Sequence, residues 1–133
     1  MGDTVVSYEG HLRSRAKHDA SGAIIVMDAP KELGGLEDGF SPSDLLGVSL
    51  GGCILGIMGI AARSMDIDIP GATVTISKEM ANLPRRFASL SVVVRIPGRF
   101  DERQQHKLEA AAHACPVHAA LGIDAPIIVE WVG

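Results

Sequence analysis

Two cysteines, Cys53 and Cys115, are the residues of this chain best suited to covalent chemistry. They are the only cysteines in the sequence, and each lies in a segment that predicts a helix. Their wide separation matches neither the short ligand spacing of a zinc knuckle nor the cysteine framework of a small secreted domain. The layout suits two thiols that meet in the fold and cycle between dithiol and disulfide. The alternative is that both are core residues, because free cysteine is among the most buried residue types.

The two thiols have different predicted surroundings. Cys115 precedes Pro116 at the start of a helical turn, where unsatisfied N–H groups and the helix dipole favour a thiolate, so we expect a lowered pKa there. Cys53 lies in the middle of an apolar helix, and an apolar setting disfavours a thiolate. A nucleophilic Cys53 therefore needs a cation from elsewhere in the fold. The candidates are Arg13 and Arg15 on the first predicted strand, and Arg85 and Arg86 in a predicted turn.

A metal site is the second chemistry to consider. His113, Cys115 and His118 lie within six residues, and Cys53 is a possible fourth ligand. Cysteine and histidine are the ligands of structural zinc. The spacing is not that of a known knuckle, however, and Pro116 redirects the chain after Cys115. We therefore keep a Cys/His metal-binding protein as an alternative and expect no bound metal.

Length, composition and charge narrow the class of protein. A chain of 133 residues predicts a single domain over residues 1–133, and 47% hydrophobic residues supply enough material for a core. The net charge of -4 and the scattered Lys and Arg residues argue against a nucleic-acid partner. The first residues show no export signal, which predicts a cytoplasmic location. In that reducing compartment a disulfide is more often catalytic than structural.

The segment 45–62 resembles a membrane span because it carries no charge, and its glycines at 47, 51, 52 and 56 have the spacing of packed membrane helices. Its length is only the minimum for a span, and the β-type segments around it need a core partner. A helix that is apolar all round is also found at the centre of a globular protein. We therefore expect no membrane partner and a central helix whose glycines allow close packing.

Hydrophobic periodicity and turn residues give the expected order of elements. Strands are predicted over residues 5–15, 23–28, 72–80, 90–96 and 127–132, and helices over 41–65, 101–114 and 117–121. Ser41 is the expected N-cap of the long helix, with Pro42 in its first turn. This order predicts an α+β fold in which antiparallel sheet wraps a central helix.

Two sequence motifs resemble the signatures of the OsmC/Ohr family, which comprises osmotically inducible and organic-hydroperoxide-resistance proteins. The stretch PSDLLGVSLGGC is similar to P-x-E-L-x(7)-C through Pro42, Asp44, Leu45 and Cys53. The stretch AAAHACPVHAAL is similar to the family's A-x(4)-C-P element through Ala110, Cys115 and Pro116. The likeness extends over almost the whole chain, and the two motifs together are specific.

The resemblance implies an intertwined homodimer in which antiparallel sheets wrap two long central helices. It implies a stress-response peroxidase that reduces organic hydroperoxides, with Cys53 as the attacking thiol and Cys115 as the resolving thiol. Arg13 best matches the arginine that activates the first cysteine, and Arg15 is the next candidate. The family likeness implies no bound cofactor, only an external dithiol reductant such as a dihydrolipoyl group.

Apolar residues around Cys53 are candidates for contact with an alkyl hydroperoxide, although core packing explains them equally well; they are Leu46, Leu50, Ile57 and Met58. The chain departs from the hydroperoxide-reductase branch at Ser43, where that branch has a glutamate that orients the arginine. Ile54 likewise replaces a residue that is usually aromatic. These departures place the chain nearer the broader OsmC-like branch, and they keep open a binding protein for small ligands without peroxidase activity.

Overall fold

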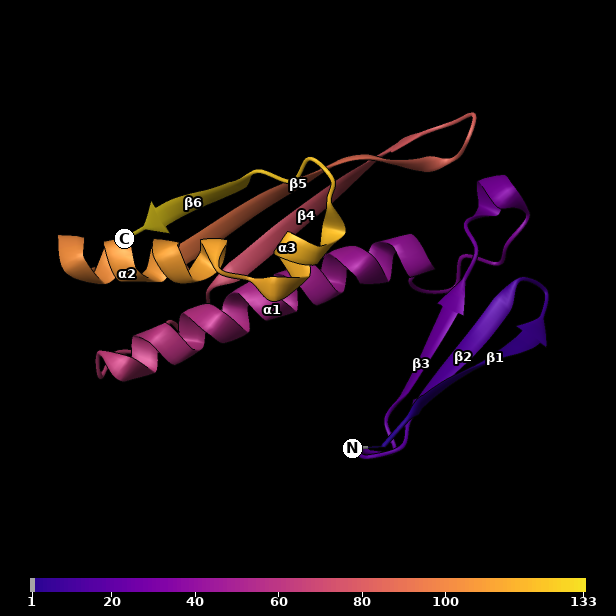
Figure 1. Ribbon diagram of the computed structural model, residues 1–133, viewed down its shortest axis with the longest axis horizontal. Coiled ribbons are helices and arrows are strands. Elements are labelled where there is room, and N and C mark those ends of the chain that lie inside the picture. The colour runs from indigo at the N-terminus through magenta and orange to yellow at the C-terminus, as the bar shows by residue number, and fades with distance from the viewer. Residues whose placement is uncertain (1) are drawn as a thin grey trace. The chain divides into compact units, whose positions relative to one another are not determined.

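The computed structural model describes residues 2–133 and contains two compact units (Figure 1). The first unit ends at Leu46, and the second runs from Gly47 to Gly133. Each unit has its own three-stranded sheet. The α+β class predicted from the sequence is confirmed. That the whole chain forms a single domain stays a prediction.

Three antiparallel strands, β1 (Thr4–Gly10), β2 (Arg13–His18) and β3 (Ile24–Asp28), form the sheet of the first unit. The single strand predicted over residues 5–15 is wrong, because the chain reverses direction between β1 and β2. Gly10, His11 and Leu12 all have positive φ angles, of 93°, 54° and 60°. Only the glycine adopts that conformation readily, so the sequence carries a weak turn signal there.

The register of the first sheet separates its side chains into two faces. Arg13 pairs with Asp28 and Arg15 with Val26, so one face carries the charged residues of β2. The other face is apolar and exposed to solvent in this chain; Val6 is 60%, Tyr8 68% and Ile25 48% exposed. An apolar sheet face of this kind is normally covered in a stable protein.

A capping box begins the long helix α1 (Pro42–Ser64), as the sequence predicts from Ser41 and Pro42. The Asp44 backbone N–H donates to Ser41 Oγ at 3.1 Å, and the Ser41 N–H donates to Asp44 Oδ2 at 3.0 Å. These reciprocal bonds satisfy backbone donors that a helix start otherwise leaves unpaired. Asp44, the acid of the first motif, therefore stabilises the start of its own helix. The loop before the helix contains one short 3-10 turn, η1 (Lys31–Leu33).

The second sheet consists of β4 (Thr73–Ala81), β5 (Arg86–Pro97) and β6 (Ile127–Val132). The strands β4 and β5 pair antiparallel, but β5 and β6 pair parallel, so the expectation of purely antiparallel sheet is wrong. The helices α2 (Glu102–His113) and α3 (Pro116–Leu121) lie between β5 and β6 in the chain. The two helices bring the chain back to the end of the sheet at which β5 begins, so β6 can run parallel to β5.

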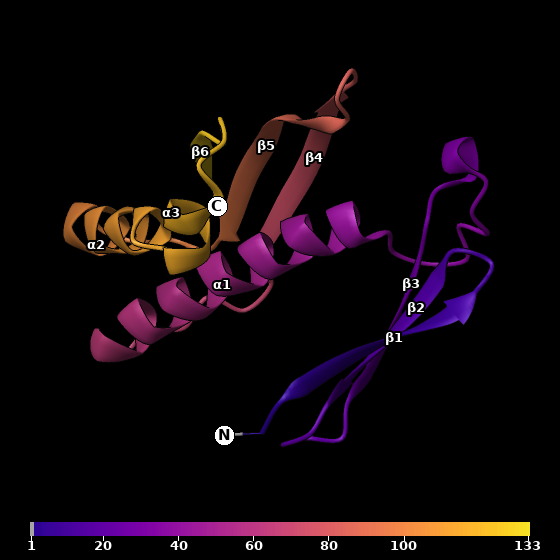
Figure 2. The same ribbon diagram turned by 45° about the vertical axis from the view of Figure 1, so that its right-hand side comes forward.

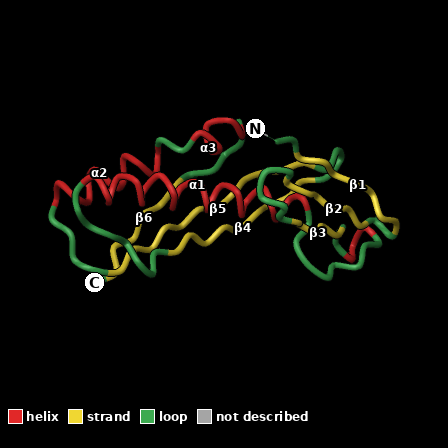
Figure 3. Tube along the Cα trace, turned by 90° about the horizontal axis from the view of Figure 1, so that it is seen from below, coloured by secondary structure: helices red, strands yellow, loops and turns green. Residues whose placement is uncertain are grey.

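Helices cover one face of this second sheet, as Figures 1 and 2 show for α2, α3 and the part of α1 that belongs to the unit. The view in Figure 3 shows the same layers from below. The core lies between the layers, and its fully buried members from α1 and β5 include Leu50, Ile54, Met58, Leu90, Val92, Val94 and Ile96. This confirms the predicted role of the apolar helix as a core element.

Glycines allow α1 to approach β4 closely, as the sequence predicts. A Cβ atom added at Gly47 would lie 2.8 Å from Ile76 Cγ2, and one added at Gly51 would lie 3.6 Å from Val74. The other helix glycines behave differently: a Cβ added at Gly52 or Gly56 meets no atom within 4 Å. One side of α1 is therefore packed on the sheet and another side is open in this chain.

By length and composition alone, α1 could also cross a membrane. Core helices of globular proteins satisfy the same criteria. In this structure Leu50, Ile54, Met58 and Ala62 of α1 are completely buried within the second unit.

Candidate functional site

Cys53 and Cys115 both lie in the second unit, although they are far apart in the sequence. Cys53 lies on α1 and is half-buried, while Cys115 is 1% exposed and is the N-cap residue of α3. Both thiols are free, and the Cys53 side chain is one of the groups that raise the pKa of Cys115. The two thiols that the sequence singled out therefore belong to the same part of the fold, with Cys115 in the core and Cys53 packed against it.

The Cys115 environment keeps its thiol protonated. Burial raises the pKa of Cys115, and the Cys53 side chain raises it further. The His118 N–H donates to Cys115 Sγ at 3.4 Å and opposes this effect, but burial is the largest influence. The expected low pKa of Cys115 is therefore wrong, because burial outweighs the helix N-terminus.

The histidines near Cys115 hydrogen-bond to backbone carbonyls. His113 Nδ1 donates to Glu109 O at 2.8 Å, and His118 Nε2 donates to Ala125 O at 2.6 Å. Within residues 2–133, no three His, Cys, Asp or Glu side chains gather as a metal site would require. The alternative of a Cys/His metal centre therefore gains no support from the geometry of the described chain.

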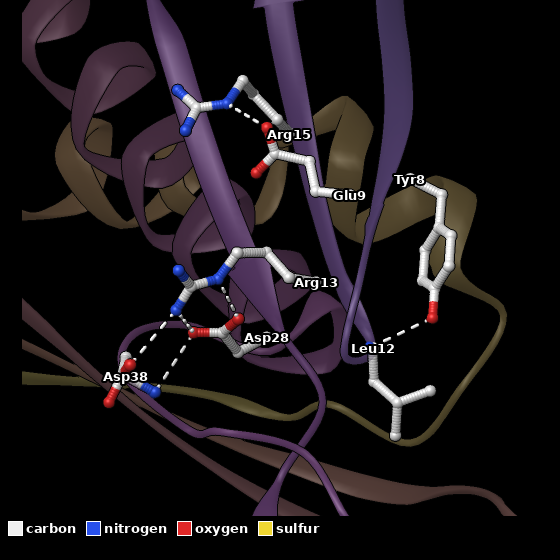
Figure 4. Close-up of polar contacts among 7 residues, drawn as sticks. All are labelled: Tyr8, Glu9, Leu12, Arg13, Arg15, Asp28 and Asp38. Carbon is white, nitrogen blue, oxygen red and sulfur yellow. Dashed lines mark hydrogen bonds and ion pairs between the residues drawn. The ribbon is translucent and has the colours of Figure 1, made fainter.

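Arg13 is held by two aspartates of its own unit (Figure 4). Its Nε donates to Asp28 Oδ1 at 2.7 Å, and its Nη2 donates to Asp28 Oδ2 at 2.9 Å and to Asp38 Oδ2 at 3.2 Å. The hydrogen bond from Arg13 lowers the pKa of Asp28, and the same bond raises the pKa of the guanidinium. Both groups therefore stay charged around neutral pH.

Neither aspartate was a candidate from the sequence. Asp28 ends an apolar strand and is only 2% exposed. A charged residue at that point of a strand is the one available signal, but only the pairing of β2 with β3 shows which cation it meets.

The other candidate cations have different partners. Arg15 Nε donates to Glu9 Oε2 at 2.8 Å, and both side chains are substantially exposed. Arg86 Nη1 donates to the carbonyls of Asn82 and Pro84, so it stabilises the turn between β4 and β5. Arg13 and Arg15 belong to the first unit and the thiols to the second, so the role of either arginine toward Cys53 stays a prediction.

The apolar candidates for substrate contact have unequal exposure. Leu50 and Met58 are completely buried in the core, and Ile57 packs against that core while remaining partly exposed. Leu46 is half-buried at the end of the first unit. Contact of Leu46, Leu50 and Ile57 with a substrate stays a prediction.

The fold is that of a small α+β protein with one free cysteine on a long core helix and a second at the start of a short helix. Residues 35–130 match the family model described as OsmC-like protein. The chain belongs to the OsmC-like family, which confirms the resemblance.

Solved and curated relatives agree with this assignment. A proposed osmotic stress induced and detoxification response protein from Psychrobacter arcticus is 37% identical, with a TM-score of 0.91 over 98% of this chain and 96% of that one. An uncharacterized protein of Acinetobacter baylyi is 28% identical over 94% of this chain and 96% of its own length. An organic hydroperoxide resistance protein from Elizabethkingia anophelis shares the fold, with a TM-score of 0.73 and 22% identity over 98% of this chain and 95% of that one.

Proposed function

We propose that this protein is a thiol-dependent peroxidase that reduces organic hydroperoxides through Cys53 and Cys115. The observation that carries the proposal is that Cys53 packs against the core that contains Cys115 and helps to raise the pKa of this buried thiol. Cys53, which is less buried, is the thiol open to a peroxide. The name of the Elizabethkingia neighbour, an organic hydroperoxide resistance protein, supports this class of substrate.

The proposed reaction has three steps: attack on the peroxide, formation of a disulfide, and reduction of that disulfide. The Cys53 thiolate attacks the O–O bond of the hydroperoxide, so that an S–O bond forms, the O–O bond breaks, and the departing alkoxide takes a proton to leave as an alcohol. The Cys115 thiol then condenses with the resulting sulfenic acid, which forms the disulfide and releases water. An external dithiol reduces the disulfide by exchange and becomes a disulfide itself.

Peroxide consumption and thiol loss test this function together. Addition of an organic hydroperoxide to the reduced protein is expected to remove both free thiols, and peptide mapping is expected to find Cys53 joined to Cys115 within one chain. A dithiol such as dihydrolipoamide should then sustain turnover. If the protein binds small apolar molecules but leaves both thiols intact in excess peroxide, it is a ligand-binding protein and the peroxidase proposal fails.

Arg13 is proposed to activate Cys53, because a thiolate in an apolar helix needs a cation close to it. Replacement of Arg13 by Ala is expected to move the pH profile of Cys53 alkylation to higher pH in a Cys115→Ser background. Lys at this residue should restore only part of the effect, because it keeps the charge but loses the planar set of donors. The profile is measured by following alkylation between pH 5 and pH 10.

Arg15→Ala provides the control for this prediction. If Arg15→Ala moves the profile and Arg13→Ala leaves it unchanged, the activating role belongs to Arg15. If neither variant moves it, the first sheet does not activate Cys53, and the peroxidase proposal loses its main electrostatic support.

A homodimer is proposed as the working form of the protein. The apolar face of the first sheet, where Tyr8 and Ile25 are exposed, and the open glycine side of α1 are surfaces that a second copy would cover. We expect a dimer in solution at low micromolar concentration, measured by light scattering. Ile25→Asp should produce monomer, whereas Lys17→Asp on the opposite face of the sheet should leave the mass unchanged. A folded wild-type monomer would contradict the dimer.

A further inference from the structure

We propose that Asp28 is the positioning residue of the candidate site, because it fixes the guanidinium of Arg13 in one orientation. This inference rests on the proposed function, in which Arg13 supports Cys53. The carboxylate that binds both Nε and Nη2 of Arg13 comes from Asp28 on the neighbouring strand.

The geometry of the pair fixes the arginine in two ways. Arg13 and Asp28 are directly opposite one another across β2 and β3, so the sheet holds both backbones. The two parallel hydrogen bonds, at 2.7 Å from Nε and 2.9 Å from Nη2, then determine the plane of the guanidinium. A bidentate arginine–carboxylate pair of this kind is more specific in direction than a single contact. One hydrogen bond alone would leave the guanidinium free to rotate.

Asp28 is itself held rigidly by the loop that follows it. Its Oδ2 accepts the backbone N–H of Asp38 at 3.1 Å, and its own backbone N–H donates to Phe40 O at 3.0 Å. The side chain is 2% exposed, so water has little access to compete for the arginine. The carboxylate stays ionised because hydrogen bonding from Arg13 lowers its pKa. Burial, charge and a fixed backbone together make Asp28 a rigid anchor.

Asp38 and Glu9, which also contact Arg13 or Arg15, lack the burial and the two parallel hydrogen bonds of Asp28. The Asp38 side chain is 71% exposed and reaches Arg13 through one contact, at 3.2 Å. Glu9 makes one contact with Arg15 at 2.8 Å, and both partners are exposed. Exposed ion pairs contribute little because solvent screens them and both side chains remain mobile. The Glu9–Arg15 pair therefore serves as a matched control on the same sheet.

The direction in which Asp28→Asn moves the pH profile of Cys53 alkylation shows whether Asp28 positions Arg13 or acts only through its own negative charge. If Asp28 acted only through its negative charge, Asp28→Asn would favour the thiolate and move the alkylation profile of Cys53 to lower pH. If Asp28 positions Arg13, the same variant releases the cation and moves the profile to higher pH. A residue with only a structural role would lower thermal stability without moving the profile.

The experiment measures Cys53 alkylation against pH in a Cys115→Ser background for Arg13→Ala, Asp28→Asn, the double variant and Glu9→Gln. We expect Asp28→Asn to move the profile upward by about one pH unit, in the direction of Arg13→Ala. The double variant should move it no further than Arg13→Ala alone, because both changes remove one interaction. Glu9→Gln should leave it unchanged.

Asp28→Glu covers the case in which Asp28→Asn does not fold. It keeps the charge but displaces the carboxylate by one methylene group, so we expect an upward shift smaller than that of Arg13→Ala. Thermal unfolding of each variant identifies those that are folded. An unmoved or downward profile in either folded Asp28 variant, beside a shifted Arg13→Ala, would overturn the inference.

A failure of the proposed peroxidase function can be distinguished from a failure of the inference about Asp28. If Arg13→Ala moves nothing, the role of Arg13 and this inference fail together, whether or not peroxide is consumed. If Arg13→Ala and Asp28→Asn both move the profile but the wild-type protein consumes no peroxide, the positioning role stands and the peroxidase proposal fails. Alkylation requires no peroxide, so the two questions are answered separately.

Discussion

Replacing Cys53 with Ser is expected to abolish the consumption of organic hydroperoxide, with a loss of at least about 100-fold in rate. A serine hydroxyl is not ionised near neutral pH, and no other cysteine in the described chain is accessible enough to replace it, because Cys115 is 1% exposed and keeps its proton. The measurement is the initial rate of peroxide loss with excess dithiol. The wild-type protein and the Cys115→Ser variant are measured in parallel.

Cys115→Ser should give a different defect. The first attack still occurs at Cys53, so one equivalent of peroxide is consumed rapidly, but the sulfenic acid has no thiol with which to condense. Further peroxide then carries Cys53 up the oxidation ladder to the irreversible sulfinic acid. Mass spectrometry of Cys53 after one and ten equivalents of peroxide shows this directly. Equal activity of the two serine variants would mean that the thiols do not have separate roles.

Leu50→Ala is expected to lower the free energy of unfolding by about 2–5 kcal/mol, the range for a truncated core leucine. Leu50 is 0% exposed and belongs to the core cluster that α1 shares with the second sheet. The loss combines the transfer free energy of the removed atoms with the cavity that they leave. Urea unfolding followed by circular dichroism measures it.

Leu83→Ala is the matched control, since it removes the same atoms from a leucine that is 97% exposed in the turn between β4 and β5. Its effect should be within about 0.5 kcal/mol of zero. If Leu50→Ala lowers the free energy of unfolding as little as Leu83→Ala does, Leu50 does not occupy the core. If Leu50→Ala is fully stable but raises the KM for the hydroperoxide, its proposed contact with substrate is favoured over core packing.

Several features could be predicted from the sequence because they depend on neighbouring residues. The start of α1 follows from Ser41 as N-cap and Pro42 in the first turn, which are neighbours in the sequence, and the bonds between Ser41 and Asp44 lie within the same turn. The closing strand at Ile127–Val132 lies where a short run of apolar and β-branched residues predicts it. The reversal at Gly10–Leu12 is not evident from the sequence, because two of its three left-handed residues, His11 and Leu12, are not typical turn residues.

Long-range pairing decided the rest of the fold. The residues of β6 do not indicate that it pairs parallel to β5. The parallel pairing results from the path of the chain through α2 and α3, which lie between the two strands. Leu50 and Leu83 are the same residue type, and only the packing of α1 on the sheet makes one buried and the other exposed.

The family, the two thiols and the helix that carries Cys53 can be read from the chain, because motif spacing and local periodicity are sequence properties. The chemical behaviour of those groups depends on the folded structure. Burial and the Cys53 side chain make Cys115 a protonated thiol, although its place at a helix start alone predicts the reverse. The register of β2 and β3 places Asp28 opposite Arg13, 15 residues away in sequence. Electrostatic environment depends on which distant residues exclude water and supply partners, and that information exists only once the chain has folded.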